Sequence, residues 1–282
     1  MPTVESEEAR ELSPQTFARF ARFITGEIGI KMPESKLTMV QSRLLRRVRD
    51  LRLNSVEQYS EYFFTSSNAE EREHFINAIT TNKTDFFREP EHFDYLTRVA
   101  LPSLSAARRR ERTKVWSAGC SSGEEPYTLA MVLKEYAAEH TGFDFAVLAT
   151  DISTKVLKLA KGAVYQESQI VPIPPELRRK YLWRSRAKDQ ALVRIVPELR
   201  RKVTFHALNF MAEDYRIRDL LDVVFFRNVL IYFDRSTQEA VINKMCRNLA
   251  PGGYFFAGHS ESLAGLDVPL RCVHTSIFRK RS

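Results

Sequence analysis

Apolar side chains recur at helical spacing over the first 80 residues. Two stripes are clear: Phe17, Phe20, Ala21 and Ile24, then Val40, Leu44, Val48 and Leu51. Two shorter apolar patterns follow between Phe63 and Ile79, and Ser13-Pro14 has the form of an N-cap followed by proline at the first helical position. No strand pattern occurs before about residue 114. Residues 1–80 are therefore predicted to form a small all-α domain.

From Lys114 onward short apolar strands alternate with helices. Strands are predicted at Val115–Ser117, Phe145–Ala149, Val203–Ala207, Asp222–Phe226, Tyr254–Ala257 and Val273–Phe278; helices at Pro126–Ala138, Ser153–Lys161 and Arg235–Leu249. Such alternation is typical of a mainly parallel sheet covered by helices on both faces. The last two strands, after the turn Pro251-Gly252-Gly253, predict a hairpin that reverses the sheet edge. Residues 81–100 are read as a linker, 101–282 as the α/β domain, and about 165–202 as an inserted β-subdomain.

The composition indicates the cellular location and the kind of partner. The longest apolar runs are too short to cross a bilayer, and the acidic N-terminus lacks the features of a signal peptide. Three cysteines without paired spacing indicate a reduced, cytoplasmic protein with no structural metal. The net charge is +8, with basic clusters at 36–52 and 176–202. These clusters suit an acidic partner or a phosphate backbone, and equally a solvated helix face.

The glycine-bearing turn after the first strand argues against a phosphate ligand. Gly119 and Gly123 would let a ligand approach the backbone, but Glu124 and Glu125 stand at the start of the next helix. Two carboxylates there would repel a pyrophosphate and favour hydroxyl or cationic groups. An acidic first turn that only complements the helix dipole is the alternative.

Polar residues follow the other strands as well. Asp151, after the second strand, could accept hydrogen bonds from both ribose hydroxyls, or could be an ordinary N-cap. Asn209 follows the third strand, and Arg227 and Asn228 follow the fourth. Ligands of open parallel sheets bind at this edge, so these residues describe a nucleoside pocket without a phosphate site. S-adenosylmethionine fits that description better than a phosphate-bearing cofactor.

Four motifs make the resemblance to a family specific. They are TTNKTDFFRE at 80–89, SSGEEPY at 121–127, RNVLIYF at 227–233 and AGHSES at 257–262. With these motifs the chain resembles, over nearly its full length, the CheR family of chemotaxis receptor glutamate O-methyltransferases. The resemblance implies a Rossmann-like S-adenosylmethionine-dependent methyltransferase that esterifies glutamates on the cytoplasmic signalling domain of methyl-accepting chemoreceptors, releasing S-adenosylhomocysteine.

The resemblance also implies roles for individual residues. Asn82, Thr84 and Arg88 would hold the amino-acid end of the cofactor, with Arg88 close to the methyl group. Asp151 and Glu125 would take the ribose or methionine end, Asn209, Phe210, Arg227 and Asn228 would line the adenine side, and Gly119 would lie against the cofactor. Tyr232 would face the acceptor channel, while His259 is as readily structural as functional.

The chemistry requires little proton transfer. A glutamate with a pKa of about 4.3 is already ionised at neutral pH, so the enzyme must desolvate the carboxylate and hold it in line with the methyl group. Arg88 and Tyr232 are the predicted positioning groups. A basic helix face made of Arg43, Arg46, Arg47 and Arg49 would dock the glutamate-rich receptor. Tether binding of the kind some members show is in doubt, because the stretch 184–190 has no glycine. A monomer is expected.

Two rival functions fit less well. An amino-group methylase of nucleic acids would carry an Asn/Asp-Pro-Pro-aromatic motif after the fourth strand, where this chain has Arg227-Asn228-Val229. A cytosine methylase would have a Pro-Cys nucleophile, and no cysteine here follows proline. A non-catalytic cofactor-binding adaptor is the other rival, and the presence of Arg88 and Tyr232 argues against it.

Overall fold

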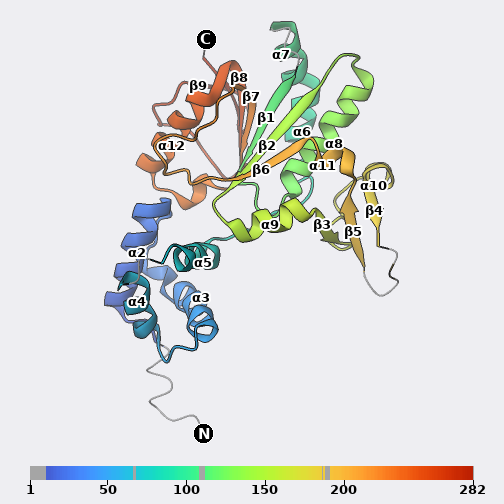
Figure 1. The fold of residues 1–282 in the computed structure, drawn as a ribbon. Coiled ribbons are helices and arrows are strands. Elements are labelled where there is room, and N and C mark those ends of the chain that lie inside the picture. Colours follow the sequence, from blue (N-terminus) through green and yellow to red (C-terminus); the bar gives the residue numbers. More distant parts are fainter. Residues whose placement is uncertain (1–10, 66–67, 108–111, 186, 188–190, 282) are drawn as a thin grey trace. The chain divides into compact units, whose positions relative to one another are not determined.

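The computed structural model describes residues 11–65, 68–107, 112–185, 187 and 191–281. The chain divides into two compact units (Figure 1). The first comprises residues 1–81 with 232–234, and the second comprises 82–231 with 235–282. Each is described by itself.

The first unit is helical. It contains α2 (Pro14–Ile28), a 3-10 turn (Glu34–Lys36), α3 (Leu37–Asp50), α4 (Val56–Thr65) and α5 (Ala69–Ile79). Ser13 caps α2 as predicted, since its hydroxyl accepts the N–H of Thr16 at 3.2 Å. The predicted stripes supply the core: Phe17, Phe20, Ile24, Val40, Leu44 and Val48 are buried, and Phe20 stacks on Phe75 with ring centroids 5.3 Å apart.

The second unit is built on a seven-stranded sheet in the order β6-β2-β1-β7-β8-β10-β9. Its strands are β1 (Thr113–Ala118), β2 (Phe145–Asp151), β6 (Val203–Ala207), β7 (Leu221–Phe226), β8 (Leu249–Ala257), β9 (Leu270–His274) and β10 (Ile277–Lys280). The first five are parallel, whereas β10 pairs antiparallel with β8 and with β9. The predicted parallel sheet with a reversed edge is thus confirmed.

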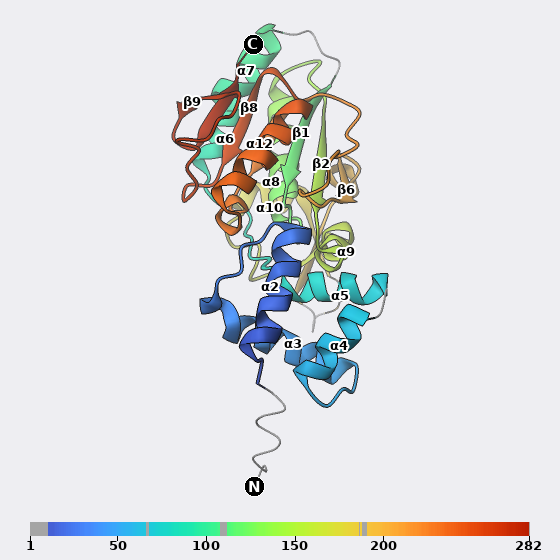
Figure 2. The same cartoon turned by 90° about the vertical axis from the view of Figure 1, so that its left-hand side faces the viewer.

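Helices cover the sheet on both faces. Its helices are α6 (Glu91–Tyr95), a π-helical turn (Leu96–Ala100), α7 (Leu101–Ala107), α8 (Glu124–Glu139), α9 (Thr154–Gly162) and α12 (Arg235–Asn248). One face carries Val115, Val147 and Phe225, which share a core with α6, α7 and α8. Successive side chains of a strand point to opposite faces, so Phe255 points to the other face. Helix α12 packs on that face, against β8 (Figure 2).

The C-terminal hairpin differs from the prediction in detail. The single strand predicted over Val273–Phe278 is wrong, because β9 and β10 are separated at Ser276, which has a φ of 56°. No glycine or proline marks this turn. The turn predicted at Pro251-Gly252-Gly253 is an irregularity inside β8, where Gly252 has a φ of 72° and the register with β7 shifts.

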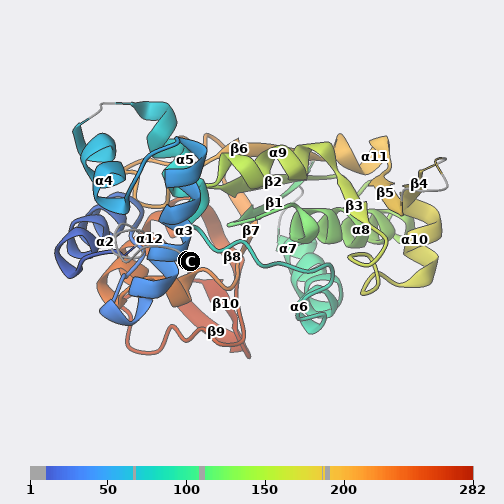
Figure 3. The same ribbon diagram turned by 90° about the horizontal axis from the view of Figure 1, so that it is seen from below.

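The inserted β-subdomain is present as a second sheet, in the order β3-β5-β4. Its strands are β3 (Val164–Gln166), β4 (Leu182–Arg184) and β5 (Leu192–Ile195), and its helices are α10 (Pro175–Tyr181) and α11 (Pro197–Arg200). Figure 3 shows these elements together beside α8. Positions 186 and 188–190 of the glycine-free stretch 184–190 lie outside the described residues.

Candidate active site

The strand order brings the four sequence-predicted strand ends to one edge of the sheet. Because β6, β2, β1 and β7 are neighbours and parallel, their carboxyl ends lie side by side. Asp151 is the last residue of β2, and the other three strands are followed by Asn209, Gly119 and Arg227. This edge is where α/β sheets place their ligands.

The turn after β1 is held tightly against β2. The backbone N–H groups of Gly119 and Cys120 donate to the carbonyl of Thr150 at 2.8 and 2.9 Å. Gly119 has a φ of 79°, and a Cβ there would lie 2.6 Å from the Val229 side chain. Only glycine therefore fits without strain. Gly123, at φ 100°, is closed in by Tyr165, whose hydroxyl donates to the carbonyl of Ser122 at 2.9 Å.

Asp151 fixes the same turn from the end of β2. Its carboxylate accepts the N–H of Ser121 and the N–H of Ser153, both at 2.9 Å. The cap of α9 is Ser153, which accepts from Val156, so the N-cap alternative for Asp151 is wrong. Burial raises the pKa of the Asp151 carboxyl. The N–H of Ile152 also donates to this carboxylate, so three backbone donors leave one of its four lone pairs for a further donor.

Glu125 and Arg227 form a buried ion pair beneath the site. The Arg227 Nε donates to Glu125 Oε2 at 2.7 Å, and the Ser117 hydroxyl donates to Oε1 at 2.6 Å. The Arg227 side chain is 2% exposed. Its Nη1 donates to the carbonyl of Arg88 at 2.7 Å. The guanidinium, read from sequence as lining the adenine side, is thus committed to contacts within the protein.

The segment 82–89 lies directly over these groups. The carbonyl of Asn82 accepts the Ser121 hydroxyl at 2.8 Å, and Thr84 is half-buried nearby in sequence. Phe87 and Glu89, on either side of Arg88, have φ values of 52° and 55°. Left-handed backbone is strained for such residues and is commonly held at functional sites. The Arg88 side chain is 35% exposed, with Nε 4.0 Å from Glu89.

Asn228 and Glu261 connect β7 to the loop after β8. Glu261 Oε2 accepts the N–H of Asn228 at 2.9 Å and that of Gly258 at 2.6 Å. The Asn228 side-chain amide donates to Glu89 at 3.3 Å. Burial raises the pKa of the Glu261 carboxyl. This loop carries the AGHSES motif, so the motif has a structural purpose at the edge of the site.

Asn209 and Phe210 lie at the β6 end. Asn209 Oδ1 accepts the N–H of Met211 at 2.9 Å. Phe210 is buried against Phe226, with ring centroids 5.0 Å apart, and near Trp116 at 6.4 Å. Phe210 therefore belongs mainly to the core that supports this strand end.

Three residues that were not singled out from the sequence also meet here. Ser117, Glu89 and His92 all contact the Glu125–Arg227 pair or its partners. Burial, and then the neighbouring Arg227, lowers the pKa of His92 to about 3, so its imidazole is neutral. Glu89 ends the TTNKTDFFRE motif, which was the one available signal; the sequence offered none for Ser117 or His92.

Among the described residues, Glu89, His92 and His259 form a group whose geometry could suit a metal. Their ligand atoms lie within 4.8 Å of one another. However, His92 Nδ1 lies 3.1 Å from the Arg227 guanidinium, a poor neighbour for a cation. His259 is exposed and its Nε2 is 2.6 Å from Glu91. The arrangement fits a cluster of polar contacts that holds these segments together better than a metal centre.

Tyr232 and the arginine face belong to the first unit. Lys31 donates its N–H to the carbonyl of Tyr232 at 2.8 Å, and Lys36 Nζ lies 5.8 Å from the centre of the tyrosine ring. Arg43 donates to Ile79 and Thr81.

Arg47, a member of the predicted docking set, is engaged in contacts within the first unit. Its guanidinium binds the buried Glu71 through both Nε, at 3.1 Å, and Nη2, at 2.7 Å. Tyr59 completes this cluster with a 2.7 Å hydrogen bond to Glu71. Arg46 and Arg49 are exposed. The helical pattern placed the four arginines mostly off the core stripe, but could not show that one of them pairs with a residue of another helix.

Comparison with known proteins now defines the class. The all-α domain of CheR methyltransferases matches residues 15–80, and the CheR S-adenosylmethionine-binding domain matches residues 82–278. The chain is therefore an S-adenosylmethionine-dependent methyltransferase, as the strand-end residues predicted. More particularly, it belongs to the CheR methyltransferase family.

Two relatives illustrate the match. A chemotaxis protein methyltransferase of Salmonella typhimurium is 37% identical over 255 residues, covering 90% of this chain and 86% of the relative. Chemotaxis protein methyltransferase 2 of Pseudomonas aeruginosa is 39% identical over 254 residues, covering 89% and 87%. The solved N-methyltransferase NodS from Bradyrhizobium japonicum aligns over 60% of each chain at 16% identity, with a TM-score of only 0.34. None of the described helices is long and apolar enough to traverse a bilayer.

Proposed function

We propose that this enzyme transfers the methyl group of S-adenosylmethionine to glutamate carboxylates on the signalling domain of methyl-accepting chemoreceptors, forming methyl esters. The observation that carries the proposal is the match of both parts of the chain to CheR methyltransferases, together with relatives named as chemotaxis protein methyltransferases. The same proposal has the enzyme act in the cytoplasm and as a monomer.

The described residues suit such a cofactor. Asp151 has a lone pair left for a ribose hydroxyl, and Gly119 presents backbone in place of a side chain. Buried Glu124 and Glu125 at the start of α8 disfavour phosphate. We assign Asn82, Thr84 and Arg88 to the amino-acid end and Asn209, Phe210 and Asn228 to the adenine side. When bound, the cofactor supplies an electrophilic methyl group on a sulfonium.

The protein's part in the chemistry is orientation. The acceptor glutamate is ionised at neutral pH, so the nucleophile needs no general base. Arg88 and Tyr232 would align its carboxylate, and exclusion of water would raise its reactivity. A strong ion pair with Arg88 would weaken the nucleophile, which fits the partial exposure of this side chain.

Arg227 and Glu125 act through Arg88. Their pair holds the Arg88 carbonyl at 2.7 Å and so sets the path of the segment between two strained residues. We therefore assign them as positioning residues for the cofactor site, in place of direct contacts to the adenine or ribose.

Receptor docking would fall to the exposed arginines of α3. Arg46 and Arg49 are exposed and Arg43 is half-buried, so these three can still face an acidic helix. Arg47 contributes to stability through its buried carboxylate partner.

A radiolabelled methyl-transfer assay with purified receptor signalling domains from the same organism tests the proposal. Base-labile label on the receptor is expected for wild type, at least a hundredfold less for Arg88→Ala, and unchanged for Arg98→Ala, an exposed arginine on the π-helical turn. If no receptor is labelled while S-adenosylhomocysteine still binds in calorimetry, the acceptor assignment fails.

A further inference from the structure

One face of the sheet near β6 is left without a helix. The strands β1, β2 and β6 are covered on one side by α8 and α9. On the other side the connection from β6 to β7, residues 208–220, forms no helix in the part of the chain described. Parallel sheets are normally covered on both faces. Here Thr204 and His206 of β6 are exposed, and Leu148 of β2 is only half-buried.

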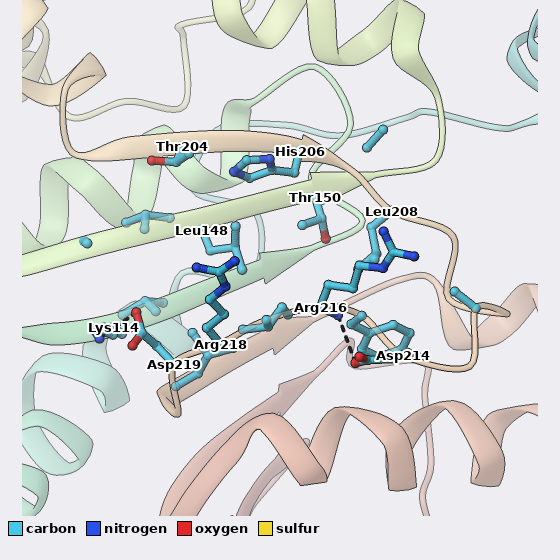
Figure 4. A pocket seen from close by; sticks show the side chains of 18 of the residues that line it. Lys114, Leu148, Thr150, Thr204, His206, Leu208, Asp214, Arg216, Arg218 and Asp219 are labelled. Carbon is cyan, nitrogen blue, oxygen red and sulfur yellow. Dashed lines mark hydrogen bonds and ion pairs between the residues drawn. The ribbon is translucent and has the colours of Figure 1, made fainter.

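A trough of about 750 Å³ runs along this face. Its floor includes Leu148, Thr204 and His206, and its wall is the segment 214–219 (Figure 4). The volume lies in the range of ligand and peptide sites. The trough is lined by residues of the second unit alone.

Two arginines stand over the trough without a counter-ion. At one end Lys114 and Arg112 are neutralised by Asp219, at 2.9 Å, and Asp144, at 2.7 Å. Arg216 and Arg218 extend from the wall toward the strands (Figure 4), and the side chain of neither forms an ion pair or hydrogen bond with any described residue.

The backbone at Arg216 is strained in support of this placement. Its φ is 53°, a left-handed conformation, and its N–H donates to the Asp214 carboxylate at 2.9 Å. Such conformations cost on the order of 1–3 kcal/mol for residues other than glycine. Strained backbone of this kind is commonly held at functional sites, and here it carries an unpaired cation beside the trough.

We propose that this trough docks an acidic segment of the methyl-acceptor protein, as a second contact apart from the reacting glutamate. The occupant is an acidic polypeptide because the unpaired groups are guanidiniums, which bind carboxylates bidentately. A single-stranded nucleic acid would need a series of aromatic stacking platforms, and of the two rings in the lining Tyr215 is buried, which leaves His206 alone exposed. The inference rests on the proposed function, since that function supplies an acceptor bearing several glutamates.

The test is steady-state methylation of the receptor signalling domain by Arg216→Glu/Arg218→Glu. The expected result is a KM for the receptor raised at least tenfold, with kcat and the KM for S-adenosylmethionine within twofold of wild type. The matched control, Arg98→Glu/Arg201→Glu, makes the same charge change at exposed arginines elsewhere in the unit and is expected to shift the receptor KM less than threefold.

Other outcomes overturn the inference. An unchanged receptor KM means that the trough docks nothing in the acceptor. A raised KM for S-adenosylmethionine means that it belongs to the cofactor site. Unaltered S-adenosylhomocysteine binding in calorimetry shows that the variant is folded, and the milder Arg216→Gln/Arg218→Gln replaces it if it is not. If wild type methylates no receptor, the proposed function itself has failed, which is distinct from wild-type activity with an unaffected receptor KM.

Discussion

Removing the buried Arg227 guanidinium is expected to destabilise the second unit strongly. Arg227→Met keeps much of the apolar stem but leaves the Glu125 carboxylate buried, with the Ser117 hydroxyl as its one remaining donor among the described residues. It also deprives the Arg88 carbonyl and His92 Nδ1 of their donor. Breaking one side of a buried pair costs about 3–5 kcal/mol. At about 2–4 °C per kcal/mol for a unit of this size, Tm should fall by on the order of 10 °C.

A double-mutant cycle separates the ion pair from general packing. Glu125→Gln alone keeps a hydrogen-bond acceptor for Arg227 but removes the charge, so Arg227→Met/Glu125→Gln should be no less stable than Arg227→Met. Denaturant unfolding of the four proteins gives the coupling, expected at about 1.5–3 kcal/mol for contacting residues. S-adenosylhomocysteine calorimetry on the same variants should show weaker binding wherever the Arg88 segment has lost its anchor.

Additive effects of the two substitutions would contradict a stabilising ion pair. A coupling below about 0.5 kcal/mol, within the range seen for independent sites, would mean that the two groups do not stabilise each other. Wild-type cofactor affinity in a folded Arg227→Met would remove its positioning role. Lys114→Met, a half-buried cation at the far end of β1, serves as the control and should change Tm by only a few degrees.

Three further perturbations follow from the same contacts. The pKa of His92 is lowered to about 3, so its neutral form favours folding. The stability that this residue confers should be lost as pH falls below about 6.5. In denaturant titrations the unfolding free energies of wild type and His92→Phe should therefore converge at acid pH. Gly119→Ala should cost about 1–3 kcal/mol and weaken S-adenosylhomocysteine binding, with Val229→Ala restoring part of both because it removes the 2.6 Å clash. Arg47→Gln should lower the unfolding free energy of the first unit by about 3 kcal/mol, whereas exposed Arg46→Gln should stay within about 0.5 kcal/mol.

The sequence was a good guide wherever the signal was periodic. The α2 and α3 stripes, the five parallel strands and the reversed edge all follow from repeating apolar positions, which depend on neighbours a few residues apart. The turn at Ser276 was not predicted because its left-handed residue is not glycine. The irregularity in β8 was predicted as a turn, because Gly252 bends the strand there without ending it.

The sequence predicted which edge of the sheet carries the site, but not which side chains of the site contact one another. Residue types after each strand marked the ligand edge, since topology alone brings strand ends together. The partner of Arg227 is Glu125, 102 residues earlier, and nothing local distinguishes that pair from two cofactor ligands. Arg47 shows the same limit in the first unit. A helical pattern predicts which side of α3 is polar, but only the tertiary structure shows that Arg47 on that side binds Glu71.

The strain around Arg88 explains why so many charges are buried beneath it. Phe87 and Glu89 both hold left-handed backbone, at an expected cost on the order of 1–3 kcal/mol each, so the segment needs an external hold to keep this path. Arg227 provides it at the Arg88 carbonyl, and Asn228 provides a second contact at the Glu89 carboxylate. Both donors follow β7, the most buried strand of the sheet, and are fixed by its position. A reaction that needs no general base depends mainly on the orientation of its reactants. Here the rigid end of β7 would provide that orientation by fixing the path of the strained segment around Arg88.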